Sequence, residues 1–307
     1  MRKIASILAL VIAATFAAQA ASAQTLKTVK ERGMLICGAN GTLAGFGLPD
    51  AQGHWTGLDV DVCRAIAAAI FNDPNKVKFV PLTAKDRFTA LQSSEVDVLV
   101  RNTTWTLSRD SSLGLNFTGV DYYDGQGFMV RKALKVNSAL ELNGASVCVQ
   151  QGTTTELNLA DFFRAHKMQL KSVTFATANE AIKSYEAGRC DAPLGPVVRQ
   201  GDDQWFDIVK WVLFAMINAE ELGITQKNVD AMLKSTNPAI KRFVGTEGNY
   251  GEQLGLTKDW AVRIIKAVGN YGEVFARNVG KDSPLKIDRG LNRLWNKGGI
   301  QYAPPIR

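Results

Sequence analysis

Residues 95–110, EVDVLVRNTTWTLSRD, join a short apolar stretch to a polar loop that closes on an arginine. The apolar part, 96–100, has the length and composition of a buried β-strand. Ligands of α/β folds bind at the carboxyl ends of parallel strands, where hydroxyl groups and a guanidinium together make a receptor for a carboxylate. We therefore predict an anion site in this loop, centred on Arg109. The alternative is that Arg109 is a surface arginine in a turn.

The alternation of strands and helices continues on both sides of this stretch. We expect strands at 34–37, 76–80, 96–100, 127–131, 146–150 and 172–175, and helices at 59–71, 86–92, 154–165 and 179–187. This alternation predicts a mostly parallel sheet with helices on its faces, arranged as two α/β lobes in series. The remaining sequence has a helical pattern, with segments at 205–222, 228–234 and 260–279 and a final turn at 291–297.

A second stretch, VCVQQGTTTELN at 147–158, repeats the arrangement in the second lobe. A strand ends at Gly152, and three threonines lead into a helix whose first N–H groups can bind an anion. Each lobe would then supply half of an anion clamp. The alternative needs no ligand: Thr153 and Glu156 have the spacing of a capping box.

The first 23 residues have the three parts of a secretory signal peptide. Arg2 and Lys3 precede an apolar run, and Ala21-Ser22-Ala23 supplies the small residues that signal peptidase requires. The strongly apolar part, 4–16, is too short to span a bilayer of about 30 Å. We expect export to the periplasm and cleavage after Ala23.

The cysteines suggest disulfides, because an exported chain with four of them can form two bonds in any of three connectivities. Pairs within each lobe, Cys37 with Cys63 and Cys148 with Cys190, are one choice that the sequence alone does not settle.

Several other classes of function are disfavoured. The cysteine spacing does not fit zinc, and two histidines argue against a metal site or a catalytic triad. The glycine-rich stretch after the first strand lacks the motifs of nucleotide binding. The net charge is +7, but the lysine and arginine residues are scattered along the chain and interleaved with acidic residues. This distribution argues against nucleic-acid binding. We expect no cofactor, no metal and no enzymatic activity, and a monomer.

Four segments resemble the periplasmic general L-amino-acid-binding proteins of ABC transporters, within the third family of bacterial solute-binding proteins. They are GLDVDVCRAIAAAIF (57–71), AKDRFTALQSSEVDVLVRNTTWTLSRD (84–110), VCVQQGTTTELNLADFFRAH (147–166) and WNKGGIQYAPPIR (295–307). The resemblance covers nearly the whole mature chain. It implies the type II periplasmic binding protein fold, in which two lobes close over one free L-amino acid and deliver it to an inner-membrane permease.

The resemblance also implies roles for individual residues. Arg109 would grip the α-carboxylate of the ligand, Asn102 and Thr104 would meet the ligand through backbone and hydroxyl groups, and an aromatic wall would come from the loop after the first strand. Thr153 and Thr154 would cap the carboxylate from the second lobe. The full expected ligand-binding set is Arg109, Thr104, Asn102, Thr153, Thr154, Gly152, Phe46, Arg101 and Arg87.

Part of the family pattern is missing between Ala192 and Pro193. In the family, the strand that begins at GRCDA (188–192) continues to a Thr-Asp pair that binds the ammonium group of the ligand, and a helix and a further strand follow. Here PLGPVV (193–198) comes at once. We therefore expect a truncated second lobe, 129–196, inserted between the two parts of the first lobe, 24–128 and 197–307.

The predicted function is thus the substrate-binding component of an amino-acid ABC transporter. One alternative is a truncated variant of that receptor that no longer binds its ligand. Another is a periplasmic dehydratase on the same fold, which would need a general acid or base in the cleft, and the sequence offers no clear candidate beside Arg109.

Overall fold

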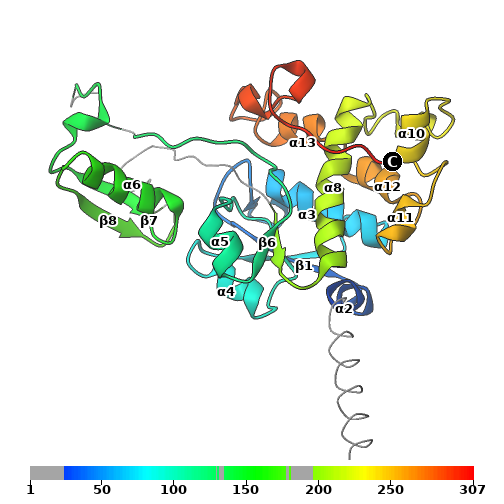
Figure 1. Cartoon of the computed structure of the whole chain (residues 1–307), viewed down its shortest axis with the longest axis horizontal. Coiled ribbons are helices and arrows are strands. Elements are labelled where there is room, and N and C mark those ends of the chain that lie inside the picture. Colours follow the sequence, from blue (N-terminus) through cyan, green and yellow to red (C-terminus); the bar gives the residue numbers. More distant parts are fainter. Residues whose placement is uncertain (1–23, 129, 131–134, 178–179, 181–195) are drawn as a thin grey trace, which may run out of the picture.

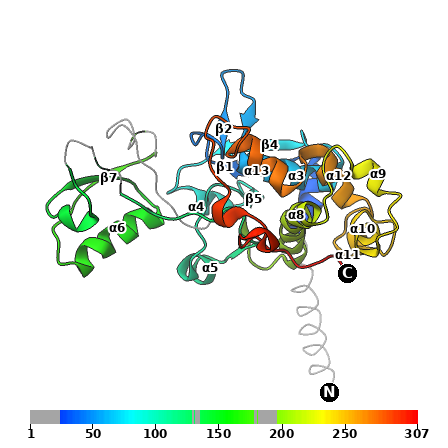
Figure 2. The ribbon, with the colours of Figure 1, turned by 90° about the horizontal axis from the view of Figure 1, so that it is seen from above.

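The computed structural model describes residues 24–128, 130, 135–177, 180 and 196–307. Figures 1 and 2 show a larger lobe that contains most of the helices and, set to one side of it, a smaller lobe with α6, β7 and β8. The predicted signal peptide, 1–23, lies outside the described residues. Among the residues that are described, no helix is both long and apolar enough to cross a membrane.

The larger lobe is built on a five-stranded sheet with the strand order β4-β1-β5-β9-β6. Its strands are β1 (Leu35–Ala39), β4 (Val77–Pro81), β5 (Val98–Leu99), β6 (Leu115–Phe117) and β9 (Val197–Arg199). Strand β1 pairs in parallel with β4 and β5, whereas β9 is antiparallel to both β5 and β6. The expected parallel arrangement therefore holds for β4, β1 and β5 and is lost where the chain returns from the smaller lobe. A separate hairpin is formed by β2 (Leu48–Pro49) and β3 (Trp55–Thr56).

Helices surround this sheet and form the main core. They are α2 (Gln24–Arg32), α3 (Leu58–Phe71), α4 (Arg87–Gln92), α5 (Leu107–Ser112), α8 (Asp203–Glu221), α9 (Val229–Met232), α10 (Pro238–Phe243), α11 (Tyr250–Gln253), α12 (Trp260–Val268) and α13 (Tyr271–Asn278), followed by the 3₁₀ turns η3 (Gly290–Asn292) and η4 (Trp295–Lys297). Helices α3, α8 and α12 contribute most of the fully buried apolar side chains to one cluster. This cluster is the hydrophobic core of the larger lobe.

The single helix expected at 260–279 is wrong, because the segment forms α12 and α13 with a break between them. Gly269 ends α12 with a φ of 83°, a conformation that glycine adopts without a steric penalty. Asn270 then starts α13 through a capping box with Glu273.

The smaller lobe contains a parallel pair of strands, β7 (Ser146–Gln150) and β8 (Lys171–Phe175), with α6 (Thr154–Ala165) between them in the chain and the turn η2 (Ala139–Glu141) before them. Its small core is formed by Leu142, Val149, Leu159 and Phe163. The strand expected at 127–131 is wrong for residues 127, 128 and 130, which have no strand structure. The helix expected at 179–187 and the junction at Ala192 and Pro193 fall outside the described residues, apart from Glu180. The truncation of this lobe therefore stays a prediction.

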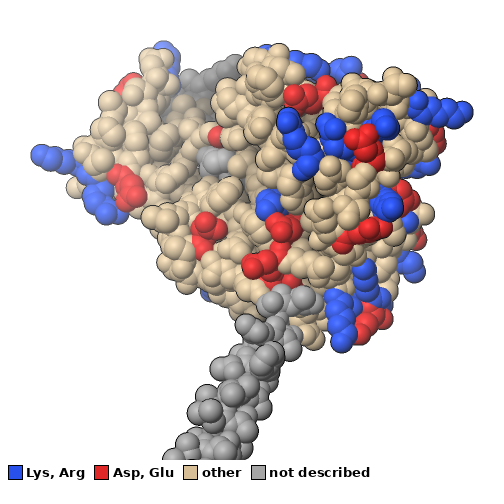
Figure 3. All heavy atoms as spheres, turned by 45° about the vertical axis from the view of Figure 1, so that its right-hand side comes forward, with Lys and Arg blue, Asp and Glu red and all other residues tan. Residues whose placement is uncertain are grey.

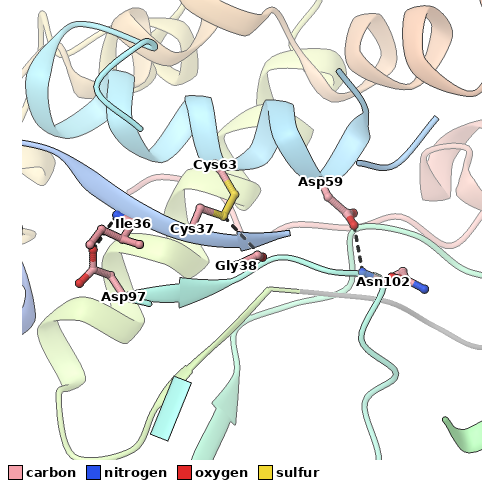
Figure 4. Close-up of a disulfide and its surroundings, with 7 residues drawn as sticks. All are labelled: Ile36, Cys37, Gly38, Asp59, Cys63, Asp97 and Asn102. Atoms are coloured by element: carbon pink, nitrogen blue, oxygen red, sulfur yellow. Dashed lines mark hydrogen bonds between the residues drawn. A yellow bond between two sulfur atoms is a disulfide. The ribbon is translucent and has the colours of Figure 1, made fainter. Parts of the chain in front are cut away.

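The predicted bond between Cys37 and Cys63 is confirmed, and it joins β1 to α3 across the core (Figure 4). The Cα atoms of the two residues are 6.4 Å apart. Cys148 has no disulfide partner among the described residues, and its predicted bond to Cys190 stays a prediction. Cys190 itself lies outside the described residues.

Candidate ligand-binding site

The candidate site lies at the carboxyl end of β5, where residues 100–106 form a loop between β5 and α5. Three arginines converge on this loop from different elements: Arg87 begins α4, Arg101 follows β5, and Arg109 lies in α5. All three are buried, with 2%, 2% and 8% of their surface exposed. Three buried guanidinium groups so close together favour an anionic ligand.

Arg109 is positioned by the start of α5. Thr106 caps this helix, and its hydroxyl accepts a hydrogen bond from the backbone N–H of Arg109. In the side chain, Nη1 donates to the carbonyl of Thr104 at 3.0 Å, and Nη2 reaches the carbonyl of Gly152 in the smaller lobe at 3.5 Å. The alternative that Arg109 is a surface residue is therefore wrong.

The guanidinium of Arg109 has no acidic partner within salt-bridge distance in the described parts of the chain. It lies over the ring of Phe88, with 5.1 Å between the guanidinium carbon and the ring centroid. Burial lowers the pKa of Arg109 to about 10, which leaves the side chain charged at neutral pH. The side chain is therefore a cation whose contacts are neutral carbonyls and an aromatic face, and it can accept a carboxylate.

Arg87 and Arg101 hold the loop itself. Arg87 donates from Nη1 to the carbonyls of Arg101 and Asn102, each at 3.3 Å, while Arg101 donates from Nε to the carbonyl of Leu82 at 2.8 Å. Burial lowers the pKa of both arginines, and the neighbouring guanidinium charges lower both further. The hydrogen bonds that they make to backbone carbonyls point to support of the loop.

Asn102 adopts a left-handed backbone conformation with a φ of 30°. Its N–H donates to Oδ2 of Asp59 at 2.9 Å, as Figure 4 shows, and its side-chain Oδ1 accepts from Nδ2 of Asn40 at 2.8 Å. Asp59 and Asn40 are residues that sequence reasoning missed. The available sequence signal for Asp59 was a carboxylate in the first turn of a helix, between the apolar residues Leu58 and Val60.

Asp59 is itself unusual, because it is a buried acid beside the three arginines. Burial raises its pKa to about 7, although the N–H of Asn102 and the charge of Arg101 act in the opposite direction. Asp121 is also buried, and burial and the charge of Asp59 raise the pKa of Asp121. Burial thus favours the neutral, protonated forms of both acids.

The smaller lobe meets this loop through the start of α6. The hydroxyl oxygens of Thr104 and Thr154 are 3.1 Å apart, so the two lobes are in direct polar contact. Gly152 has a φ of 73°, and a Cβ at this position would lie 3.1 Å from the Cα of Lys85 in the larger lobe. The structure thus brings together four of the expected residues, Arg109, Thr104, Gly152 and Thr154.

Thr153 is engaged in helix capping. Its hydroxyl accepts from the N–H of Glu156 at 3.2 Å and donates to the carbonyl of Gln150 at 2.6 Å. The carboxylate of Glu156 accepts from the N–H of Gly152 at 2.8 Å rather than from that of Thr153. This arrangement differs from a capping box by one residue.

Phe46 lies in the core of the larger lobe, with its ring edge to face against Tyr122 at 5.0 Å between centroids. Its backbone is held close to the start of α3, because a Cβ on Gly57 would be only 2.0 Å from the carbonyl oxygen of Phe46. The role of Phe46 as a wall against the ligand stays a prediction.

Other site chemistries find little support in the described residues. They contain no group of three or more histidine, cysteine, aspartate or glutamate side chains able to hold a metal ion. On the face shown in Figure 3, basic and acidic side chains are interspersed over the larger lobe. The three arginines of the candidate site are buried and are not part of this surface.

Comparison with known proteins gives a consistent result. Residues 35–231 match the bacterial extracellular solute-binding proteins, family 3. The general L-amino acid-binding periplasmic protein AapJ of Rhizobium johnstonii is 58% identical, over 94% of this chain and 95% of its own. The glutamate/glutamine/aspartate/asparagine-binding protein BztA of Rhodobacter capsulatus is 51% identical, over 96% of each chain.

A solved structure is similar over most of the chain. It is an ABC transporter/periplasmic binding protein from Brucella ovis with glutathione bound, with 55% sequence identity and a TM-score of 0.88. The similarity covers 93% of this chain and 100% of that one. All three similar proteins are named as binding proteins and none as an enzyme.

Proposed function

Because the chain belongs to family 3 of the bacterial extracellular solute-binding proteins, we propose that it is the substrate-binding component of an amino-acid ABC transporter. It is exported to the periplasm with cleavage of its signal peptide after Ala23, binds one free L-amino acid between its lobes as a monomer, and presents it to an inner-membrane permease. The names of the similar proteins from Rhizobium and Rhodobacter support this proposal.

The position of Arg109 is the observation that carries the proposal. This buried cation lies between the carbonyls of Thr104 and Gly152, at the contact of the two lobes. A ligand carboxylate takes the two-pronged hydrogen bonds that a guanidinium offers. The hydroxyls of Thr104 and Thr154 and the N-terminal end of α6 complete the acceptor site from both sides. Arg101 and Arg87 hold the loop in place.

We further propose that the second lobe is shorter than in the relatives and that the carboxylate end of the ligand dominates recognition. The alignment with the Rhizobium protein runs over 323 positions, more than the 307 residues of this entire chain. Some positions of that relative therefore have no counterpart here, which supports the deletion placed between Ala192 and Pro193. A receptor that has lost its ammonium-binding acid binds more weakly, since that charge is desolvated without a partner.

A γ-glutamyl peptide is the second candidate ligand. The similar structure from Brucella ovis has glutathione bound. The glutamyl end of glutathione carries the same α-amino and α-carboxylate groups as a free amino acid. Arg109 can therefore hold either ligand, and the space available to the rest of the molecule decides between them.

Thermal unfolding of residues 24–307 tests the proposal. Glutamate, glutamine, alanine, histidine and glutathione are added separately at millimolar concentration. A ligand that binds only the folded chain stabilises it by about 2.7 kcal/mol at 100 times its Kd, so a bound ligand raises Tm.

A cooperative transition that no ligand moves would support the binding-defective alternative, and a broad or absent transition would show that the truncated chain does not fold. As matched controls, Arg109→Gln is expected to abolish the rise, whereas Arg164→Gln is expected to preserve it. Arg164 is an exposed arginine of α6 paired with Asp161.

A further inference from the structure

Two buried aspartates accept backbone N–H groups at opposite ends of the central strands, as Figure 4 shows. At the amino end of β5, Oδ2 of Asp97 accepts from the N–H of Ile36 at 2.7 Å and also binds Arg32. At the carboxyl end, Oδ2 of Asp59 accepts from the N–H of Asn102 at 2.9 Å. The interactions are alike, but only the second lies at the candidate site.

Asn102 needs to be held. A side-chain-bearing residue with positive φ is strained, although asparagine tolerates this conformation better than most residues. Four residues anchor it: Asp59 binds the N–H, Asn40 and Arg101 bind the side-chain oxygen, and Arg87 binds the carbonyl. Of these four residues, Asp59 is the one that accepts a hydrogen bond from the backbone N–H of Asn102.

The conformation of Asn102 sets the path of the next residues. Thr104, two residues later, presents its carbonyl to Nη1 of Arg109 and its hydroxyl to Thr154 of the smaller lobe. A change at Asn102 therefore moves both groups that Thr104 supplies to the site. Asp59 is 1% exposed, which keeps its own carboxylate away from a ligand.

We infer that Asp59 is a positioning residue, which acts through Asn102 to hold the carboxylate-binding loop and Arg109 in the geometry that binds the ligand. This inference rests on the proposed function, because its effect on affinity presupposes a ligand. Asp97 supplies the matched case of a buried aspartate that supports the fold from the other end of the strands.

The test compares Asp59→Ala, Asp59→Asn and Asp97→Ala in the chain 24–307. Asp59→Ala removes the acceptor of the Asn102 N–H, whereas Asp59→Asn retains a side-chain oxygen at that position. Titration calorimetry measures Kd for a ligand that stabilises the wild type, and hydrogen exchange measures protection of the Asn102 amide without ligand.

We expect Asp59→Ala to weaken binding by about 10- to 100-fold and to remove protection at Asn102. Asp59→Asn should restore both to within about fivefold of the wild type. Asp97→Ala should lower Tm but leave Kd unchanged. If Asp59→Ala does not fold, Asp59→Leu replaces it, since an apolar side chain of similar volume removes the acceptor without leaving a cavity.

Two results would overturn the inference: unchanged Kd and unchanged protection at Asn102 in Asp59→Ala, or equal losses of affinity in Asp59→Ala and Asp97→Ala. If the wild type binds no ligand, the proposed function fails. The exchange measurement still decides whether Asp59 holds Asn102.

Discussion

Replacing Arg109 tests whether this residue serves ligand binding or the stability of the fold. In the ligand-free protein this side chain is a buried cation in contact with carbonyls and with the ring of Phe88. Burial lowers its pKa to about 10, which means that its charge costs the folded lobe free energy at every lower pH. Arg109→Met removes this cost, and Arg109→Lys retains the charge but loses the two-pronged geometry.

The magnitude follows from the burial. Because 8% of the surface of Arg109 is exposed, the hydrogen bonds that we propose it makes to a ligand carboxylate would be shielded from water. Removing one partner of such a buried charge pair costs about 2 to 5 kcal/mol of binding free energy, or roughly 30- to 4,000-fold in Kd. Arg109→Lys should lose less than Arg109→Met. The ligand-free Tm of Arg109→Met should equal or exceed that of the wild type.

Titration calorimetry for Kd and calorimetric melts without ligand measure the two quantities on the same preparations. The expected pattern is a large loss of affinity with no loss of stability. A fall in the ligand-free Tm together with an unchanged Kd would refute the reasoning, since it would mean that Arg109 supports the fold and does not meet the ligand.

Three further predictions concern the disulfide, the buried acids and the lobe contact. Cys37→Ala opens a bond between residues separated by 26 positions, so it should cost about 3 to 4 kcal/mol in urea unfolding; an unchanged midpoint would contradict this. Burial raises the pKa of Asp59 to about 7 and raises that of Asp121 well above the unfolded value of 3.8, so the stability that the two protonated acids contribute is fully present below pH 3.8 and is lost progressively as pH rises toward their folded pKa values. Asp121→Asn should therefore raise Tm at pH 8 and change it little at pH 3, and equal shifts at both pH values would count against this account. Gly152→Ala should weaken ligand binding by roughly tenfold, because its Cβ meets Lys85; Gly144→Ala, which has a similar φ of 77° but open space around it, should leave Kd unchanged.

Local signals predicted the elements of the smaller lobe best. The strand at 146–150 and the helix at 154–165 agree with β7 and α6 because an apolar strand pattern and a threonine cap define them within a few residues. The break at Gly269 was missed because the apolar spacing continues through it. The antiparallel place of β9 was missed because it depends on the path by which the chain returns to the sheet.

The residues of the candidate site were predicted less completely than the helices and strands. The loop after β5 and Arg109 follow from the position of ligands in α/β folds. The support from Asp59 does not, because it joins residues 43 positions apart in the sequence. The burial of Arg109 likewise depends on Gly152, which lies 43 positions away. Such contacts form only in the folded chain, so no short window of sequence contains them.

The pairing of Leu99 with Val197 places the whole smaller lobe inside a loop that the sheet of the larger lobe closes on itself. The free-energy cost of closing a long loop comes from lost chain entropy. It rises only with the logarithm of the loop length, by about 0.6 kcal/mol for each doubling. Removing some tens of residues from within this loop therefore changes the closure cost by less than that amount. The larger lobe can keep its stability while the inserted lobe loses or gains whole elements, so the two can diverge in evolution at different rates.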